Sequence, residues 1–230
     1  MIEQRRSSSD LTRYLIDVPL FNGLSEAALT ALSRASRRLQ LPKGIFLFFQ
    51  EDPADSVYVM RSGSVAITLS SEDGRELVIN EMRPGEVFGE VGLITGKPRT
   101  TSALTREASE VMVISGAVFL DTLRGEAGLA QRLLILLADR LGASSERESA
   151  LAFLEAPARV ARVLLLLEEQ SKSKGYVTIS QEELAQRTGL TRQTVARFLG
   201  QWRRNGWLIT GRGRIMLLNH VALKELISDR

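Results

Sequence analysis

The sequence predicts an α+β fold in three parts: a β-barrel or jelly roll, one long helix, and a winged helix-turn-helix. Short β-rich runs separated by glycine-containing turns fill residues 41–115, which is typical of a barrel or jelly roll. A helical apolar stripe follows over residues 117–153, and a basic segment with helix-capping residues begins near residue 180. The predicted domains are residues 1–116, 117–155 and 156–230.

The composition excludes several classes of site. The 230 residues include no cysteine and a single histidine, His220. Disulfides, thiolate metal sites and cysteine-ligated iron–sulfur clusters are therefore ruled out, and a histidine-built metal site is not expected. The longest apolar runs are shorter than the ~20 residues of a membrane span, and the N-terminus lacks the pattern of a signal peptide. We expect a cytoplasmic protein without metal or membrane contact.

The charge is distributed unevenly along the chain. The formal net charge is +3. Residues 181–215 contain seven arginines against two glutamates, which gives +5 locally and leaves −2 for the rest. A basic end on a nearly neutral body predicts a polyanionic partner for that end.

Two helical segments are predicted before the barrel. The first 20 residues are polar and are expected to be loosely ordered, apart from a short helical start at residues 11–17. A second helix is expected over residues 25–38, where Ser25 has the side chain and the position of an N-cap.

Residues 41–115 are predicted to supply the strands of the barrel. The β-rich runs are IFLFF, SVYVM, SVAITL, LVIN, VFG and EVMVI. Val65, Ile67 and Leu69 alternate with small or polar residues, which predicts one buried face for that strand. The pair Asp73-Gly74 predicts a hairpin turn to the next strand.

A single long helix is predicted over residues 117–153. Its apolar stripe consists of Leu129, Leu133, Leu136, Leu137, Leu141 and Leu151. One small barrel cannot cover so long a stripe, so we expect a parallel helix from a second chain to cover it. Arg140 and Ser144 fall within the stripe, where they either set the helix register or contact a ligand. Pro157 is expected to end the long helix.

The stretch FGEVGLITGKPRT, residues 88–100, combines features of an anion site. Gly89 allows close approach of the backbone, Arg99 can donate charge-assisted hydrogen bonds to a phosphate, and Thr100 adds a hydroxyl. Glu90 would repel a phosphate, but it can accept a hydrogen bond from a neighbouring sugar hydroxyl. The alternative is a surface turn with a structural Glu–Arg ion pair, and these residues alone leave both open.

The basic segment has the pattern of a winged helix-turn-helix. Ser180 and Glu183 form a capping box at the start of a first helix. Gly189 suits the turn between two helices, and Thr191 can cap the second. The GRGR sequence at residues 211–214 predicts the tight turn of a wing. The alternative is a solvated basic helix in a small helical domain.

The second helix of this segment is predicted to present two different faces. Its apolar face consists of Val195, Phe198, Leu199 and Trp202. Its polar face consists of Arg192, Gln193, Ala196, Arg197 and Gly200. Such a face suits the major groove, where arginine pairs with guanine and glutamine with adenine. The arginines expected on phosphates or in the wing are Arg203, Arg204, Arg212 and Arg214. The candidate DNA-binding residues are Thr191, Arg192, Gln193, Thr194, Arg197, Arg203, Arg212 and Arg214.

The order of barrel, long helix and winged helix resembles the cyclic AMP receptor protein/FNR (Crp/Fnr) family of bacterial transcription regulators. The likeness spans nearly the whole chain, through VPLFNGLSEAAL, GSVAITL, FGEVGLITGKPRT, ALAFLEAPARVARVLLLL and TRQTVARFL. Phe88-Gly89-Glu90 and Pro98-Arg99-Thr100 resemble the two ends of the family's phosphate-binding cassette. The resemblance implies a β-jelly-roll cyclic-nucleotide-binding domain, a long dimerisation helix and a winged helix-turn-helix DNA-binding domain.

The resemblance also implies roles for individual residues. By this likeness the cyclic-nucleotide site consists of Gly89, Glu90, Val91, Arg99, Thr100, Arg140, Ser144, Ser145, Ile79 and Asn80. Gly89, Glu90 and Val91 would face ribose and phosphate. Arg99 and Thr100 would hold the phosphate, and Ile79 and Asn80 would line the pocket. Ser144 would contact the base of its own subunit's ligand, and Ser145 would reach the ligand of the partner.

We therefore expect a homodimeric transcription regulator, and not an enzyme, controlled by cyclic AMP or a related cyclic nucleotide. Its partners would be a palindromic operator in double-stranded DNA and a second copy of the chain, with RNA polymerase as a further candidate. One alternative is a Crp/Fnr-type regulator that binds DNA without ligand or with another nucleotide. A more remote alternative is a cyclic-nucleotide-binding regulatory subunit of an enzyme or channel, against which the winged helix counts strongly.

Two residues depart from the family pattern. The cassette has Thr101 where alanine is usual. The second helix has Gln193 where the family's best-known member has glutamate, which predicts a different DNA site because glutamine prefers adenine and glutamate accepts from cytosine. The lack of cysteine argues against the iron–sulfur-sensing branch, and the scarcity of histidine and cysteine argues against haem sensing.

Overall fold

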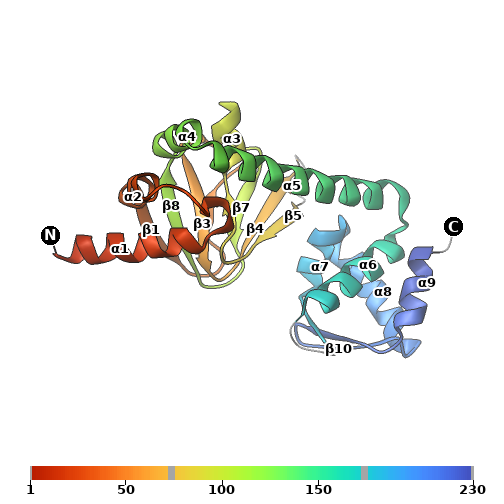
Figure 1. The fold of residues 1–230 in the computed structure, drawn as a ribbon. Coiled ribbons are helices and arrows are strands. Elements are labelled where there is room, and N and C mark those ends of the chain that lie inside the picture. Colours follow the sequence, from red (N-terminus) through yellow and green to blue (C-terminus); the bar gives the residue numbers. More distant parts are fainter. Residues whose placement is uncertain (1, 72–75, 172–175, 229–230) are drawn as a thin grey trace. The chain divides into compact units, whose positions relative to one another are not determined.

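The computed structural model describes residues 2–71, 76–171 and 176–228, with side chains from residue 10 onward (Figure 1). The predicted Asp73-Gly74 turn lies outside the described residues. The chain separates into two compact units: Met1–Ser71 with Val78–Leu141, and Glu72–Leu77 with Gly142–Arg230. The predicted three-domain division stays a prediction.

Helices and strands follow one another in an α+β arrangement. The helices are α1 (Ile2–Asp17), the 3-10 helix η1 (Pro19–Phe21), α2 (Glu26–Arg34), α3 (Glu90–Thr95), α4 (Gly116–Gly125), α5 (Ala127–Phe153), α6 (Ala156–Gln170), α7 (Gln181–Thr188), α8 (Arg192–Arg204) and α9 (His220–Ser228). The strands are β1 (Ser36–Leu41), β2 (Phe46–Phe48), β3 (Ser56–Ser62), β4 (Val65–Ser70), β5 (Glu76–Met82), β6 (Val87–Phe88), β7 (Ser102–Thr105), β8 (Ser109–Ser115), β9 (Val177–Thr178), β10 (Leu208–Gly211) and β11 (Arg214–Leu217).

Two sheets in the first unit form the predicted jelly roll. Their strand orders are β1-β8-β3-β6 and β2-β7-β4-β5. Side chains from both sheets meet in one apolar interior, which consists of Phe48, Tyr58, Met60, Val65, Ile67, Met82, Phe88, Ala103, Val111 and Val113. Because strands from the two sheets bury side chains against each other, the fold is a closed roll and not an open sheet.

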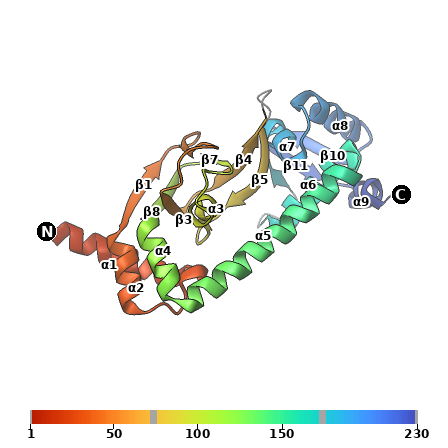
Figure 2. The same ribbon diagram turned by 90° about the horizontal axis from the view of Figure 1, so that it is seen from above.

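The N-terminal segment is helical over a longer stretch than predicted. Helix α1 spans Ile2–Asp17, so the expectation of a loosely ordered start with helix only at residues 11–17 was wrong. Leu11 and Leu15 lie one helical turn apart and are buried, 3% and 0% exposed. They pack in a second core with residues of α2, α4 and the sheet that contains β3. Figure 2 shows α1, α2 and α4 together at one end of this unit.

The helix after α1 begins as predicted and ends earlier. Ser25 is its N-cap, and Ser25 Oγ accepts a hydrogen bond from the Ala28 N–H at 3.2 Å. The helix ends at Arg34 and not at the predicted residue 38, because Ser36–Leu41 pairs with β8 as strand β1.

The single long helix predicted from residue 117 is divided in two. Glu126 is in an extended conformation, with φ −118° and ψ 90°, and separates α4 from α5. Ser25 Oγ donates to Glu126 Oε1 at 2.5 Å, so the junction is joined to the start of α2. Leu129 and Leu133 of the apolar stripe are buried within the first unit. Leu141, in contrast, is 69% exposed, and its coverage by a second chain stays a prediction.

One strand prediction was wrong in detail. Val65, Ala66, Ile67 and Thr68 are all buried, whereas Leu69 is 37% exposed. The strand lies inside its sheet, between β7 and β5, and both of its faces are covered over these four residues. The alternation of apolar with small or polar residues therefore did not indicate a strand face exposed to solvent.

The second unit has the elements predicted for a winged helix-turn-helix. Helix α6 begins after Glu155 and carries Pro157 in its first turn. A three-stranded sheet of order β10-β11-β9 accompanies helices α6 to α9. The core includes Leu164, Leu184, Val195, Leu199, Trp202, Leu208, Ile215 and Leu223. Because strands and helices share this core, the basic helix belongs to a folded domain.

Candidate functional site

Helix α3 provides the first part of the predicted anion site. It begins at Glu90 directly after Gly89, which has a φ of 82° in the left-handed region. A Cβ atom on Gly89 would lie 2.9 Å from Arg99 Nη1 and 3.0 Å from Tyr58 Cδ2. The backbone conformation and the lack of space both favour glycine at this position.

Glu90 is buried and has one carboxylate oxygen without a partner. Its side chain is 1% exposed, and Glu90 Oε1 lies 2.6 Å from Arg140 Nη1. Arg140 Nη2 also donates to the carbonyl oxygen of Val87 at 2.5 Å. Within the described part of the chain, no donor contacts Glu90 Oε2. Because an unsatisfied buried oxygen costs free energy, this atom is suited to accept a hydrogen bond from a bound hydroxyl group.

Arg99 is buried between two aromatic rings. Its side chain is 2% exposed, and Cζ lies 4.5 Å from the ring centroid of Phe48 and 5.5 Å from that of Tyr58. Arg99 Nη1 donates to the Gly89 carbonyl oxygen at 2.5 Å, and Nη2 donates to the Ser56 carbonyl oxygen at 2.9 Å. Sequence reasoning missed these two rings, although aromatic residues on strands that enclose an arginine could have indicated them.

The alternative ion pair between Glu90 and Arg99 is not the one that forms. Glu90 pairs with Arg140, while Arg99 lies 3.8 Å from Asp55 Oδ1. The structure therefore brings together Gly89, Glu90, Arg99 and Arg140 from three separate segments of the sequence.

The other predicted ligand residues differ in their surroundings. Val91 is 39% exposed and Thr100 is exposed. Ile79 packs against the apolar interior of the roll, and Asn80 Oδ1 accepts a hydrogen bond from the Glu81 N–H at 2.8 Å. Ser144 and Ser145 belong to the second unit, where Ser144 Oγ donates to Glu148 Oε1 at 3.2 Å. Their role in a nucleotide site stays a prediction.

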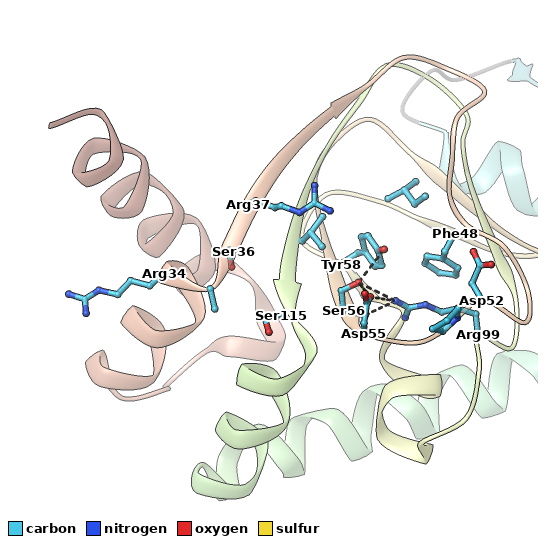
Figure 3. A pocket seen from close by; sticks show the side chains of 14 residues that line it. Arg34, Ser36, Arg37, Phe48, Asp52, Asp55, Ser56, Tyr58, Arg99 and Ser115 are labelled. Atoms are coloured by element: carbon cyan, nitrogen blue, oxygen red, sulfur yellow. Dashed lines mark hydrogen bonds and ion pairs between the residues drawn. The ribbon is translucent and has the colours of Figure 1, made fainter. Parts of the chain in front are cut away.

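Arg99 also lines a cavity of about 650 Å³, drawn in Figure 3. Its walls come from the end of α2, from β1, β2, β3 and β8, and from the loop between β2 and β3. Among the ligand residues predicted from the sequence, all within the described part of the chain, only Arg99 lines it. In the same part of the chain, no cluster of three histidine or acidic side chains could hold a metal ion.

The turn between α7 and α8 has the predicted caps. Ser180 Oγ accepts from the Glu183 N–H at 3.1 Å, and Thr191 Oγ1 accepts from the Thr194 N–H at 3.2 Å. Gly189 has a φ of 65° after the end of α7. The Glu183 side chain pairs with Arg187 at 3.1 Å. These contacts give the two helices defined ends on either side of a short turn.

Helix α8 has the two predicted faces. Val195, Leu199 and Trp202 are 0%, 1% and 2% exposed. The side chains exposed on this helix and its N-cap are Thr191, Arg192, Gln193, Arg197, Gln201, Arg203 and Arg204. In the wing, Gly211 pairs with Arg214 across the turn, and Arg212 is exposed there. Arginines therefore line the exposed side of α8 and continue into the wing.

Comparison with protein families matches both units. Residues 38–126 match the cyclic nucleotide-binding domain, and residues 158–226 match the Crp-like helix-turn-helix domain. The chain is 32% identical over 199 residues to a CRP-like cAMP-activated global transcriptional regulator of Mycobacterium tuberculosis, covering 82% of this chain and 87% of that protein. The chain belongs to the Crp/Fnr family of transcription regulators.

Further relatives show how widely this Crp/Fnr likeness extends. The cyclic AMP receptor protein of Thermus thermophilus is 34% identical, over 90% of this chain and 96% of that protein. The structure of CLP, a c-di-GMP-responsive global regulator of Xanthomonas campestris, has a TM-score of 0.75 and 29% identity, covering 84% of this chain and 99% of that chain. The match to the Crp-like helix-turn-helix domain, together with these relatives, supports DNA binding by this Crp/Fnr chain. In the described part of this Crp/Fnr chain, no helix is both long enough and apolar enough to cross a membrane.

Proposed function

We propose that the protein is a homodimeric regulator whose binding to a palindromic DNA operator is controlled by cyclic AMP or a closely related cyclic nucleotide. The observation that carries this proposal is Glu90, which is 1% exposed and has Oε2 without a partner in the described chain. A ribose hydroxyl is a donor that satisfies this oxygen, and a nucleotide brings it together with a phosphate. The names of two relatives, which refer to cyclic AMP, support this choice.

The phosphate of the nucleotide would be held by Arg99 and by backbone N–H groups at the start of α3. Arg99 Nη1 is 2.5 Å from the Gly89 carbonyl oxygen, so the phosphate has to replace or share this acceptor. Thr100 is exposed next to Arg99 and would add a hydroxyl donor. On the base side, Ser144 would contact the purine in its own subunit and Ser145 the purine in the partner.

Dimerisation is supported by apolar side chains left exposed on α5. Leu134, Ile135 and Leu141 are 68%, 56% and 69% exposed. Leu134 and Leu141 are seven residues apart on one helix, the spacing of a coiled-coil seam. A parallel pair of α5 helices would cover them and would give the dimer two α8 helices, which a palindromic operator engages one turn of DNA, about 34 Å, apart.

The test compares cyclic AMP with its 2′-deoxy form by titration calorimetry. For the wild type we expect the missing ribose hydroxyl to weaken binding by about tenfold or more, because it leaves a buried acceptor unpaired. In Glu90→Gln the two ligands should bind with similar affinity. If titration of cyclic AMP into the wild type produces no heat of binding, the choice of cyclic AMP is overturned. Arg99→Lys, which keeps the charge but loses the planar fork, should weaken both ligands.

A second candidate is a regulator of the same family that binds DNA without ligand or responds to another nucleotide. It is favoured by the contacts of Arg99, whose two terminal nitrogens already donate to the carbonyls of Gly89 and Ser56. The name of one relative, CLP, refers to c-di-GMP. Selection of bound sequences from random DNA by protein alone, with cyclic AMP, and with c-di-GMP separates the candidates. Equal and tight selection in all three would favour ligand-independent binding.

A further inference from the structure

The cavity beside Arg99 has an inward-pointing cation on its opposite wall. In the sheet register, Arg37 of β1 is opposite Val113 of β8, and Val113 is opposite Tyr58 of β3. Val113 and Tyr58 are 6% and 7% exposed. Residues opposite one another in neighbouring strands point to the same face of a sheet, so Arg37 points into the end of the roll. Figure 3 shows Arg37 and Arg99 on different sides of the cavity, while Arg34 extends away from it.

The neighbouring arginine shows that this position is unusual. Arg38 points to the other face of β1, where its guanidinium lies 2.9 Å from Glu110 and 3.6 Å from Asp10. Arg37 has no hydrogen bond or ion pair with any side chain in the described part of the chain. Arg37 is exposed at the mouth of the cavity, so its guanidinium is solvated and can pair with an anion that enters.

Polar groups continue from Arg99 towards Arg37. Arg99 Nη2 donates to Ser56 Oγ at 3.2 Å, and Ser56 Oγ lies 3.2 Å from the Tyr58 hydroxyl. The cavity also contains Ser36 and Ser115.

The acidic groups of the cavity already have partners. Asp52 accepts from the Phe49 N–H at 2.7 Å, and Asp55 accepts from Ser56 Oγ at 2.9 Å. Arg34 extends away from the cavity, so the two inward arginines are matched in number by the two aspartates. Of these four groups, Arg37 is the one without a hydrogen-bonding or ion-pair partner in the described part of the chain.

We propose that this cavity binds a small, multiply charged phosphate anion. The exposed Arg37 would donate hydrogen bonds to it, and the buried charge of Arg99, whose terminal nitrogens already donate to backbone carbonyl oxygens, would attract it from the other side. Arginine guanidinium groups match the geometry of phosphate oxygens and can donate two parallel hydrogen bonds. The cavity of about 650 Å³ is large enough for a diphosphate group with water. Phe48 and Tyr58 are only 7% exposed and lie against the Arg99 guanidinium, so they offer no surface on which a base can stack. The assigned ligand is therefore the phosphate chain itself.

The anion would also oppose binding of the cyclic nucleotide, and this part rests on the proposed function. Both ligands require Arg99. An anion in the cavity favours the present position of this side chain, whereas a phosphate at α3 draws Nη1 away from the Gly89 carbonyl. Because coupling between two binding sites is reciprocal, cyclic AMP should weaken anion binding by the same factor by which the anion weakens cyclic AMP binding.

The direct test is titration of pyrophosphate into the full-length protein at constant ionic strength. We expect the wild type to bind it and Arg37→Ala to bind it about tenfold or more weakly, the usual effect of losing one charge-assisted hydrogen-bonding partner. Arg124→Ala is the matched control, because Arg124 is a 72% exposed arginine on α4 that pairs with Asp121. Equal affinity of wild type and Arg37→Ala, or equal weakening by Arg124→Ala, would overturn the proposal.

Two further arms separate the chemistry and the coupling. ADP carries the same diphosphate, and we expect it to bind no more tightly than pyrophosphate; tighter binding would overturn the assignment to the phosphate chain alone. Titration of cyclic AMP with and without saturating pyrophosphate measures the coupling, and unchanged affinity would overturn it. If cyclic AMP does not bind at all, the proposed function fails while the pyrophosphate titration still decides the anion site.

Arg37 has one other role that the fold suggests. An inward charge on the edge strand β1 discourages pairing with other chains. If Arg37→Ala binds pyrophosphate as tightly as the wild type does, this is the role that remains for Arg37.

Discussion

Arg140 Nη1 lies 2.6 Å from Glu90 Oε1 and joins helix α5 to the first residue of helix α3. Glu90 is 1% exposed and Arg140 is 22% exposed, so removal of the arginine leaves a buried carboxylate without a counterion. We expect Arg140→Ala to lower the free energy of unfolding by about 3 kcal/mol. Chemical denaturation measures this loss. The double variant Glu90→Gln with Arg140→Ala should recover part of it, and equal instability of the single and double variants would contradict this account.

Gly89 and Gly96 form a matched pair at the two ends of α3. Both have positive φ, 82° and 66°, but a Cβ atom has no neighbour within 4 Å at Gly96 and meets Arg99 and Tyr58 at Gly89. Gly96→Ala should cost about 1 kcal/mol of stability, from the left-handed conformation alone. Gly89→Ala should cost about 1–3 kcal/mol more, because the site is also overpacked. Thermal unfolding compares the two variants, and equal costs would mean that Arg99 and Tyr58 move aside freely.

The exposed leucines of α5 predict how the chain associates. Leu134→Glu and Leu141→Glu each place a carboxylate at the proposed seam, and each should weaken the dimer by about a hundredfold or more, because a buried unpaired charge costs several kcal/mol. Ala143→Glu is the control, since residue 143 is exposed on the opposite side of α5. Sedimentation velocity over a range of protein concentrations measures the effect. A dimer that tolerates both leucine variants would rule out this seam.

Gln193 is exposed near the start of α8 and predicts part of the DNA sequence preference. Gln193→Glu should shift the preferred base from adenine towards cytosine on the pairing strand, with about 1–3 kcal/mol of discrimination. Gln201→Glu introduces the same charge at another exposed position of α8, and it should weaken all sequences alike. Selection from random DNA with each variant tests the assignment, and identical preferences of the wild type and Gln193→Glu would refute it.

Glu110 predicts a pH dependence of stability. Burial alone would raise the pKa of this carboxyl, but the hydrogen bond from Arg38 and the charge of Arg61 outweigh it and hold the pKa below its ordinary value. A lowered pKa in the folded state stabilises the protein above the pKa of the unfolded state, and this stability is lost as the pH falls through the folded-state pKa. The advantage of the wild type over Glu110→Gln should therefore be present at pH 7 and disappear in acid. Glu107→Gln, at an exposed position nearby, is the control. Thermal unfolding across pH measures both, and a constant difference for Glu110→Gln would exclude the effect.

Local signals in the sequence predicted the ends of helices well. Ser25, Ser180 and Thr191 were predicted as N-caps, and each accepts the expected backbone hydrogen bond. Each of these hydrogen bonds joins residues three positions apart, so it can be read from the sequence directly. The same holds for the wing turn, where a glycine with positive φ follows Arg212.

Features that depend on tertiary contacts were predicted less well. The break at Glu126 was missed, since the apolar periodicity continues through it and the contact with Ser25 bridges 101 positions of sequence. The partner of Glu90 was predicted as a hydroxyl or Arg99, whereas the structure adds Arg140, 50 positions away. The inward direction of Arg37 follows from the register with β8, which the residues of β1 alone do not specify.

The core of the first unit determines which segment can be transferred to another protein as a sensor. Leu11 and Leu15 at one end of the chain segment and Leu129 and Leu133 at the other are all buried in the same cluster. A chimera that took only the strands and α3 would remove eleven of the sixteen buried residues of this cluster and expose the sheet beneath it. A biosensor built from this protein should therefore carry α1 through the first turns of α5, with the fusion partner joined beyond them.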